Sequence, residues 1–126
     1  MTYRMTPQRL AILDVLDGNR EHPSAEDVYR EVKKRFPTMS LATVYNTLDL
    51  LSRRGELREL AIDPARKRYD PDVDDHSHMM CDECGRIADV GRSVAVQPGE
   101  DERMGFEITG IRVEFHGRCP ECRTRR

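Results

Sequence analysis

Two pairs of cysteines constrain the fold of this chain more than any other feature. Cys81 and Cys84 form one Cys-x-x-Cys pair, and Cys119 and Cys122 form the other. Four thiolates in two such pairs can close a tetrahedral shell around Zn²⁺ and leave no open coordination position. The 34 residues between Cys84 and Cys119 exceed the usual zinc-ribbon spacing, so we expect the ion to join the start of a C-terminal domain to its end. Disulfides and a redox-active pair are the alternatives, and no βαβ pattern surrounds the pairs to support the second.

The size and composition of the chain agree with a metal-stapled protein. Its 126 residues can form one ordinary domain or two small ones, and 6% aromatic residues with no Trp provide little core. Zinc or a partner chain would supply the missing stability. No apolar run approaches the ~20 residues that span a bilayer, and no signal-peptide core follows Met1. We therefore expect a soluble cytoplasmic protein.

The first 70 residues predict three helices followed by a β-hairpin. Each helix is indicated by a cap and an apolar stripe: Thr6-Pro7 with Leu10, Leu13 and Leu16; Ser24 with Val28, Val32 and Phe36; Ser40 with Val44, Leu48 and Leu51. Extended segments at 57–62 and 67–69 flank the turn signal Asp63-Pro64. This order is the winged helix-turn-helix pattern, so we predict a DNA-binding domain over residues 1–70.

The remainder predicts a hinge and a small second domain. Residues 71–75 are acidic and contain a proline, as a linker does, and short strands are expected at 78–80, 87–90 and 107–115. Residues 1–70 hold 13 basic and 11 acidic side chains, whereas residues 71–126 hold 8 and 12. This asymmetry suits a DNA-facing first half and a cation-binding second half. The predicted fold class is α+β, with a small zinc-stapled second domain over residues 76–126.

The third predicted helix is the candidate for reading DNA. A recognition helix presents its N-terminal residues to base edges, while basic side chains nearby contact phosphates. The candidates for base edges are Ser40, Ala42, Thr43, Tyr45 and Asn46, and those for phosphates are Arg53, Arg54, Arg66, Lys67 and Arg68. An ordinary solvated helix face followed by a surface hairpin is the alternative reading.

A second group of side chains predicts a reversible metal site. His76 and His78 point to one face if this segment is a strand, and several acidic residues lie nearby: Asp70, Asp72, Asp74, Asp75 and Asp89. Imidazoles mixed with carboxylates suit iron or manganese, and zinc with less preference. His22 before Pro23 reads by itself as a loop residue, and His116 as a histidine on a strand surface.

Taken together, these segments resemble the ferric uptake regulator (Fur) family over nearly the whole chain. The matching blocks are Met5-Thr6-Pro7-Gln8-Arg9, His22 to Tyr29, Ser40 to Asn46, Arg68-Tyr69-Asp70, His76 to Gly85, and Gly117 to Cys122. The resemblance implies a homodimer that presents two winged helices to a palindromic DNA operator, and a structural Zn²⁺ on the four cysteines. It further implies a regulatory Fe²⁺ or Mn²⁺ on His22, Asp70, His76, His78 and Asp89, which makes His22 a ligand.

Within that family the chain is similar to the peroxide-responsive (PerR-like) branch. That branch carries Asp at the positions of Asp70 and Asp89, where iron sensors usually carry Glu, and Asp75 stands where iron sensors tend to have a further His. The branch implies that bound Fe²⁺ reacts with H₂O₂ and that a ligand histidine, His22 or His76, is oxidised. Mn²⁺ would support DNA binding without that reaction. An iron- or zinc-responsive repressor is the alternative within the family.

The chain differs from the family pattern at two places, and two other classes of protein remain as alternatives. The chain begins about five residues before Thr6, so an N-terminal helix common in the family is expected to be missing. Pro98 and Gly99 fall where a dimerisation helix is usual, in the segment 92–103, so that helix is expected to be shortened. We expect a regulator with no organic cofactor rather than an enzyme. A non-haem iron enzyme built on two His and one Asp, or a zinc-ribbon interaction module without a sensing site, are the alternatives.

Overall fold

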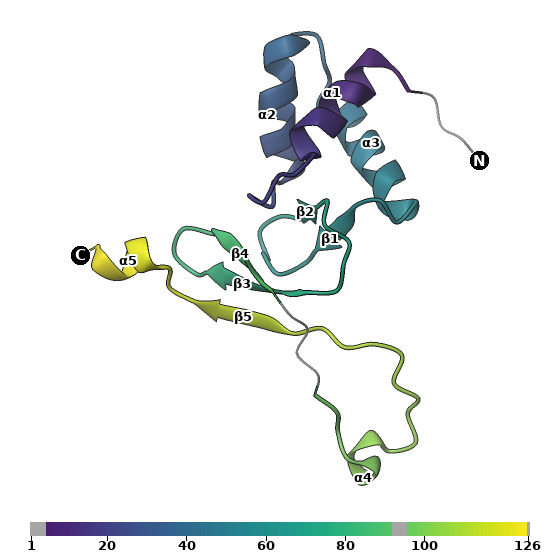
Figure 1. Cartoon of the computed structure of the whole chain (residues 1–126), viewed down its shortest axis with the longest axis vertical. Helices are drawn as coiled ribbons and strands as arrows, with labels where there is room; N and C mark the ends of the chain where they lie inside the picture. Colours follow the sequence, from purple (N-terminus) through teal and green to yellow (C-terminus); the bar gives the residue numbers. More distant parts are fainter. Residues whose placement is uncertain (1–4, 92–95, 126) are drawn as a thin grey trace. The chain divides into compact units, whose positions relative to one another are not determined.

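The computed structural model describes residues 5–91 and 96–125 and divides into two compact units between Asp74 and Asp75 (Figure 1). The two are called the N-terminal unit and the C-terminal unit below. Residues 1–4, 92–95 and 126 lie outside the described residues. The expected absence of an N-terminal helix concerns the first of these segments, and the expected shortening of the dimerisation helix concerns the second in part. Within the described residues, no helix is both long enough and apolar enough to cross a membrane.

Three capped helices form the N-terminal unit: α1 (Pro7–Leu16), α2 (Ala25–Arg35) and α3 (Leu41–Arg53). The hydroxyl of Thr6 accepts from the N–H of Arg9 at the start of α1, and that of Ser40 accepts from Thr43 at the start of α3. At α2, Ser24 and Asp27 satisfy each other's backbone N–H groups in a capping box. The predicted helix starts are therefore confirmed.

The apolar faces of these helices meet in one core, but one helix is rotated from its predicted orientation. Val28, Val44 and Leu48 are fully buried, as their spacing predicts. In α1, by contrast, the core side chains are Ala11, Ile12 and Leu16, while Leu10 is 49% exposed. The prediction for Leu10 was wrong because Ile12 and Leu16 fix the inward face, and Leu10 lies off that face.

An antiparallel hairpin completes the N-terminal unit. It consists of β1 (Arg58–Leu60) and β2 (Arg68–Asp70), with Glu59 opposite Tyr69. Tyr69 is buried in the helical core, so the hairpin is anchored to the three helices. The predicted winged-helix architecture is confirmed.

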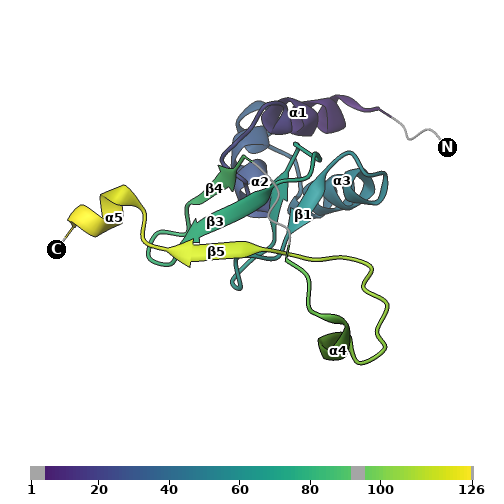
Figure 2. The ribbon, with the colours of Figure 1, turned by 60° about the horizontal axis from the view of Figure 1, so that its bottom comes forward.

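A three-stranded sheet forms the centre of the C-terminal unit. Its strands are β3 (Ser77–Cys81), β4 (Ile87–Val90) and β5 (Glu114–Gly117), in the order β4-β3-β5. Figure 2 shows β3 between its two neighbours, antiparallel to β4 and parallel to β5. A short helix, α5 (Pro120–Thr124), follows β5.

The connection between β4 and β5 differs from its prediction. Between residues 96 and 113, all of which are described, the chain forms one short helix, α4 (Glu100–Arg103), and no strand. The strand predicted at 107–115 was therefore wrong over its first seven residues. Phe106 and Ile108 belong to an alternating pattern, but within the described chain this segment has no neighbouring strand, and β-structure requires one. Pairing with β3 starts at Glu114.

Candidate metal centres and DNA-facing helix

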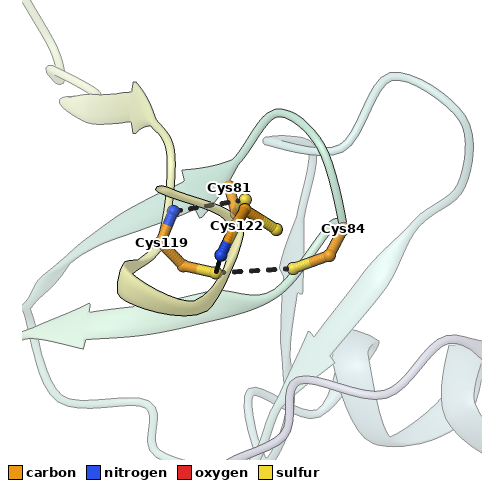
Figure 3. A group of neighbouring side chains, drawn as sticks. All are labelled: Cys81, Cys84, Cys119 and Cys122. Atoms are coloured by element: carbon orange, nitrogen blue, oxygen red, sulfur yellow. Dashed lines mark hydrogen bonds between the residues drawn. The ribbon is translucent and has the colours of Figure 1, made fainter. Parts of the chain in front are cut away.

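The four cysteines converge in the C-terminal unit (Figure 3). One sulfur from each of Cys81, Cys84, Cys119 and Cys122 lies within 4.8 Å of all the others, and all four are free thiols rather than disulfides. The Cys84 and Cys119 sulfurs are 3.8 Å apart. Zn–S bonds of about 2.3 Å in a tetrahedron place the sulfurs about 3.8 Å apart. The cluster therefore has the ligand type and spacing of a structural zinc site.

Two tight turns bring the pairs together. After β3, the N–H of Gly85 donates to the carbonyl of Cys81 at 2.9 Å, and Gly85 adopts a φ of +78° that other residues rarely take. On the opposite side, Cys119 caps α5, with Pro120 in the first turn. Since β3 and β5 are neighbours with Cys81 opposite Gly117, the ends of the two strands carry both pairs to the same place.

The turns also prepare one sulfur for metal binding. Backbone N–H groups, first that of Cys119 at 3.3 Å and then that of Cys84, stabilise the thiolate of Cys81 and lower its pKa from 9.0 to about 6. The neighbouring thiols, Cys119 first, raise the pKa of Cys122. A metal ion that binds Cys122 must therefore displace its proton.

The N-terminal unit places a histidine against an aspartate. The Nε2 atom of His22 lies 3.5 Å from a carboxylate oxygen of Asp70, and both side chains are buried. His22 adopts a φ of +54°, a left-handed conformation that costs a residue other than glycine on the order of 1–2 kcal/mol. Strained backbone of this kind is frequent where a side chain must point into a functional site.

The hairpin holds this pair in place. Strand β2 lies against the loop before α2, where the N–H of Tyr69 donates to the carbonyl of Pro23 at 2.9 Å. The guanidinium of Arg68 donates to the carbonyl of His22 at 3.1 Å. Residues 46 positions apart in sequence are thereby joined, and His22 and Asp70 form what we call the N-terminal half-site.

The C-terminal unit contributes three further side chains. His78 lies in β3 directly opposite Asp89 in β4, and His76 lies two residues before His78, just before the strand. The Nε2 atoms of His76 and His78 are 3.2 Å and 3.5 Å from the same Asp89 oxygen. Ligands about 2.1 Å from an octahedral ion lie about 3 Å apart when adjacent. These three residues form the C-terminal half-site.

The other acidic candidates and His116 lie elsewhere. Asp72, Asp74 and Asp75 are exposed residues of the segment before β3. His116 is an exposed residue of β5 whose Nδ1 is 3.6 Å from a carboxylate oxygen of Asp82, as expected of a surface histidine.

The exposed face of α3 carries the predicted base-reading side chains. Ala42, Tyr45 and Asn46 are exposed and Thr43 is partly exposed, while Val44 and Leu48 point into the core. The Tyr45 hydroxyl donates to a carboxylate oxygen of Glu26, in the first turn of α2, at 2.8 Å. Sequence reasoning missed Glu26, because residues 19 apart in different helices show no periodic signal.

The predicted phosphate-contacting side chains differ in their availability. Arg53, Arg54 and Lys67 form surface ion pairs, and Arg66 lies in the exposed turn of the hairpin. Arg68 is instead only 13% exposed, and its guanidinium contacts Asp63 at 3.0 Å as well as the carbonyl of His22. Arg68 therefore holds the hairpin and the N-terminal half-site together, which leaves its guanidinium less available for phosphate contact than the exposed side chains.

These features define the class of the protein as a metal-dependent, DNA-binding regulator of transcription. They are the winged three-helix unit, the second unit stapled by four thiolates, and the histidines that lie beside carboxylates. The comparisons give the family. Residues 1–116 match the ferric uptake regulator family, and the chain belongs to it. The peroxide operon regulator of Bacillus subtilis is 40% identical over 126 residues, covering 94% of this chain and 83% of that protein.

Two solved structures agree with this assignment. The Campylobacter jejuni peroxide stress regulator superposes with a TM-score of 0.67 at 29% identity, covering 92% of this chain and 89% of that one. The Francisella tularensis ferric uptake regulator, solved with iron, gives 0.77 at 25% identity over 98% and 96%. All three relatives are named as regulators, in agreement with the expectation that this chain is not an enzyme.

Proposed function

We propose that this chain is a homodimeric repressor that binds a palindromic operator while Fe²⁺ or Mn²⁺ occupies its regulatory site, and that peroxide releases it by oxidising a ligand histidine. The observation that carries the proposal is the pairing of histidine with aspartate in each unit: His22 with Asp70, and His76 and His78 with Asp89. Imidazole with carboxylate suits iron and manganese. The 40% identity to a peroxide operon regulator supports the peroxide-responsive branch.

Neither half-site can satisfy such an ion alone. The N-terminal half-site offers two side chains and the C-terminal half-site offers three, whereas octahedral coordination needs six ligands. We propose that one ion takes all five and keeps one position open. An ion bonded to both units fixes the angle between them. Operator half-sites lie about 34–36 Å apart, so a dimer whose two recognition helices have a fixed separation binds better than one with loose units.

The protein's own residues determine what peroxide does. An Fe²⁺ ion held by these side chains would activate H₂O₂ by passing one electron to it and regaining one from the attacked ring, so the ion is unchanged overall, and Mn²⁺ would not do so. A ring C–H bond of His22 or His76 would become C–OH, which adds one oxygen atom to the imidazole, while the O–O bond breaks and the second oxygen leaves as water. The oxidised ring is a poorer ligand, so the two half-sites separate. Asp70 and Asp89 remain in their units but cannot hold the ion by themselves.

The DNA contacts follow from α3 and the hairpin. We propose that Ser40, Ala42, Thr43, Tyr45 and Asn46 face base edges in the major groove. Arg53, Arg54, Arg66 and Lys67 contact phosphates, and the resulting affinity falls as salt rises.

Operator binding before and after peroxide tests the proposal. Chain loaded with zinc in the cysteine site and with Fe²⁺, Mn²⁺ or Zn²⁺ in the regulatory site is assayed on DNA that the Mn²⁺ form selects from random sequence. We expect brief H₂O₂ to abolish binding of the Fe²⁺ form alone, with a one-oxygen mass gain on a peptide containing His22 or His76. Loss of binding only on metal removal, with no oxidised peptide, would identify an iron- or zinc-responsive repressor instead.

Two histidine variants provide the matched comparison. His22→Ala is expected to lose metal-dependent operator binding while it keeps its structural zinc. His116→Ala, an exposed histidine outside both half-sites, is expected to behave as the unmodified chain does. Unchanged operator binding by His22→Ala would show that the N-terminal half-site holds no regulatory ion.

A further inference from the structure

A hydrogen bond to a neighbouring helix holds Tyr45, the aromatic side chain on the exposed face of α3. Tyr45 is 43% exposed, and its hydroxyl donates to the Glu26 carboxylate at 2.8 Å. Glu26 lies in the first turn of α2, where the capping box of Ser24 and Asp27 satisfies the backbone N–H groups of both residues. The contact therefore links the outer face of the proposed reading helix to a neighbouring helix.

We propose that Glu26 is a positioning residue for DNA recognition: its carboxylate holds the Tyr45 ring in the orientation in which it meets a base. The inference rests on the proposed function, since it requires α3 to read DNA. An exposed tyrosine otherwise distributes among rotamers, and binding must then restrict it. Restricting one side chain in advance is worth about two- to tenfold in binding.

Because Glu26 is negatively charged, a positioning role can be distinguished from a direct contribution to DNA affinity. The Tyr45 hydroxyl first, and then the backbone N–H of Glu26, stabilise the carboxylate and lower its pKa, and Arg66 in the hairpin turn adds to the effect. Glu26 is thus ionised at neutral pH. A carboxylate beside a DNA-binding face repels phosphates whatever the sequence. Any gain in base discrimination from Glu26 must therefore act through Tyr45, and it is expected only at the base pairs that Tyr45 contacts.

Two substitutions at Glu26 isolate the two effects. Glu26→Gln keeps an acceptor oxygen for the Tyr45 hydroxyl but removes the charge. Glu26→Ala removes both. We expect both variants to bind random-sequence DNA more tightly than the unmodified chain, and only Glu26→Ala to lose discrimination between bases.

The experiment measures base preference position by position. Mn²⁺-loaded full chain is titrated with its selected operator and with every single base-pair variant of it. Glu26→Ala and Tyr45→Phe are each expected to reduce the ratio of affinities for the selected and the substituted base pair by about two- to tenfold, at the same operator positions. The double variant is expected to reduce this ratio no further than either single variant does. Glu26→Gln is expected to keep the preference. Glu31→Gln removes the same charge from the same helix, where Glu31 pairs with Lys34, and serves as the control.

The possible results distinguish failure of the positioning role of Glu26 from failure of the proposed operator binding. Flattening at different positions in the two single variants, additive loss in the double variant, or failure of Glu26→Gln to retain preference would each overturn the positioning role. A uniform loss at every position would do the same, because it indicates damage to the fold. If the unmodified chain shows no base preference at all, the proposed operator binding itself fails.

Discussion

Asp89 lies directly across the antiparallel pair from His78, and one of its carboxylate oxygens is within 3.5 Å of the imidazoles of both His78 and His76. The strand register produces this arrangement, because residues opposite each other in such a pair have Cβ atoms about 4.5–5.5 Å apart. A short aspartate side chain suffices at that distance. Two of the three side chains of the C-terminal half-site, His78 and Asp89, are therefore built into the sheet, and His76 lies just before it.

Replacing this aspartate should remove regulatory metal binding and little else. Asp89→Asn keeps the side-chain shape but loses the charge that binds a divalent ion. We expect the Mn²⁺ affinity of zinc-loaded protein to fall more than about tenfold, since loss of an outer-shell partner alone costs 10–100-fold. Calorimetric titration measures it. Asp82→Asn, which alters an exposed carboxylate beside His116, should retain the affinity; equal losses in both variants would count against the half-site.

Loss of one zinc ligand should unfold the C-terminal unit selectively. That unit buries few apolar side chains, among them Met80 and Ile87, so the zinc supplies most of its stability. We expect Cys122→Ser to lose bound zinc and the protection of β3–β5 against hydrogen exchange. All four tyrosines lie between residues 3 and 69, so tyrosine fluorescence follows the N-terminal unit alone. Its unfolding midpoint should stay unchanged, and Thr124→Ala should keep the zinc.

The Asp63–Arg68 pair gives the N-terminal unit a defined acid sensitivity. Burial favours the neutral acid, but the N–H of Ala65 and the Arg68 guanidinium outweigh it and lower the pKa of Asp63 below 3.8. A carboxylate with a depressed pKa stabilises the fold above its ordinary value, and that stability is lost as pH falls through the folded-state value.

Asp63→Asn should therefore destabilise the N-terminal unit by about 1.5–3 kcal/mol at neutral pH, the range for a hydrogen bond to a charged group. The difference from the unmodified chain should shrink between about pH 5 and pH 2, as both come to carry a neutral side chain. Urea unfolding followed by tyrosine fluorescence measures it. A difference that is the same at both ends of that range would show that the charge of Asp63 contributes nothing.

The capping box of α2 should be worth a measurable part of the stability. Ser24 is fully buried, and its hydroxyl accepts from the N–H of Asp27. Ser24→Ala leaves that donor without its cap, and we expect a loss of about 1 kcal/mol in the free energy of unfolding. The same fluorescence assay applies. Ser24→Thr keeps the hydroxyl and should recover part of the loss, unless the buried site rejects its methyl group.

Much of the fold followed from local patterns. Caps at Thr6, Ser24 and Ser40 marked the helix starts, because a helix begins where a side chain can satisfy its first N–H groups. The prediction of a strand at 107–115 was wrong over residues 107–113. Alternating apolar residues show which side chains would share a face of a strand, but a strand also needs a neighbouring strand to pair with.

The sequence by itself determined the zinc cluster and the winged helix. Two Cys-x-x-Cys pairs at this spacing favour a four-thiolate site, and capped amphipathic helices before a hairpin require a core on one side of each helix. Only the tertiary structure decided which distant residues meet. It placed His22 against Asp70, used Arg68 to hold that pair rather than leave it on the surface, and bonded Glu26 to Tyr45. Residues 19 to 48 positions apart share no periodicity, so such contacts arise only once the helices and the hairpin have packed.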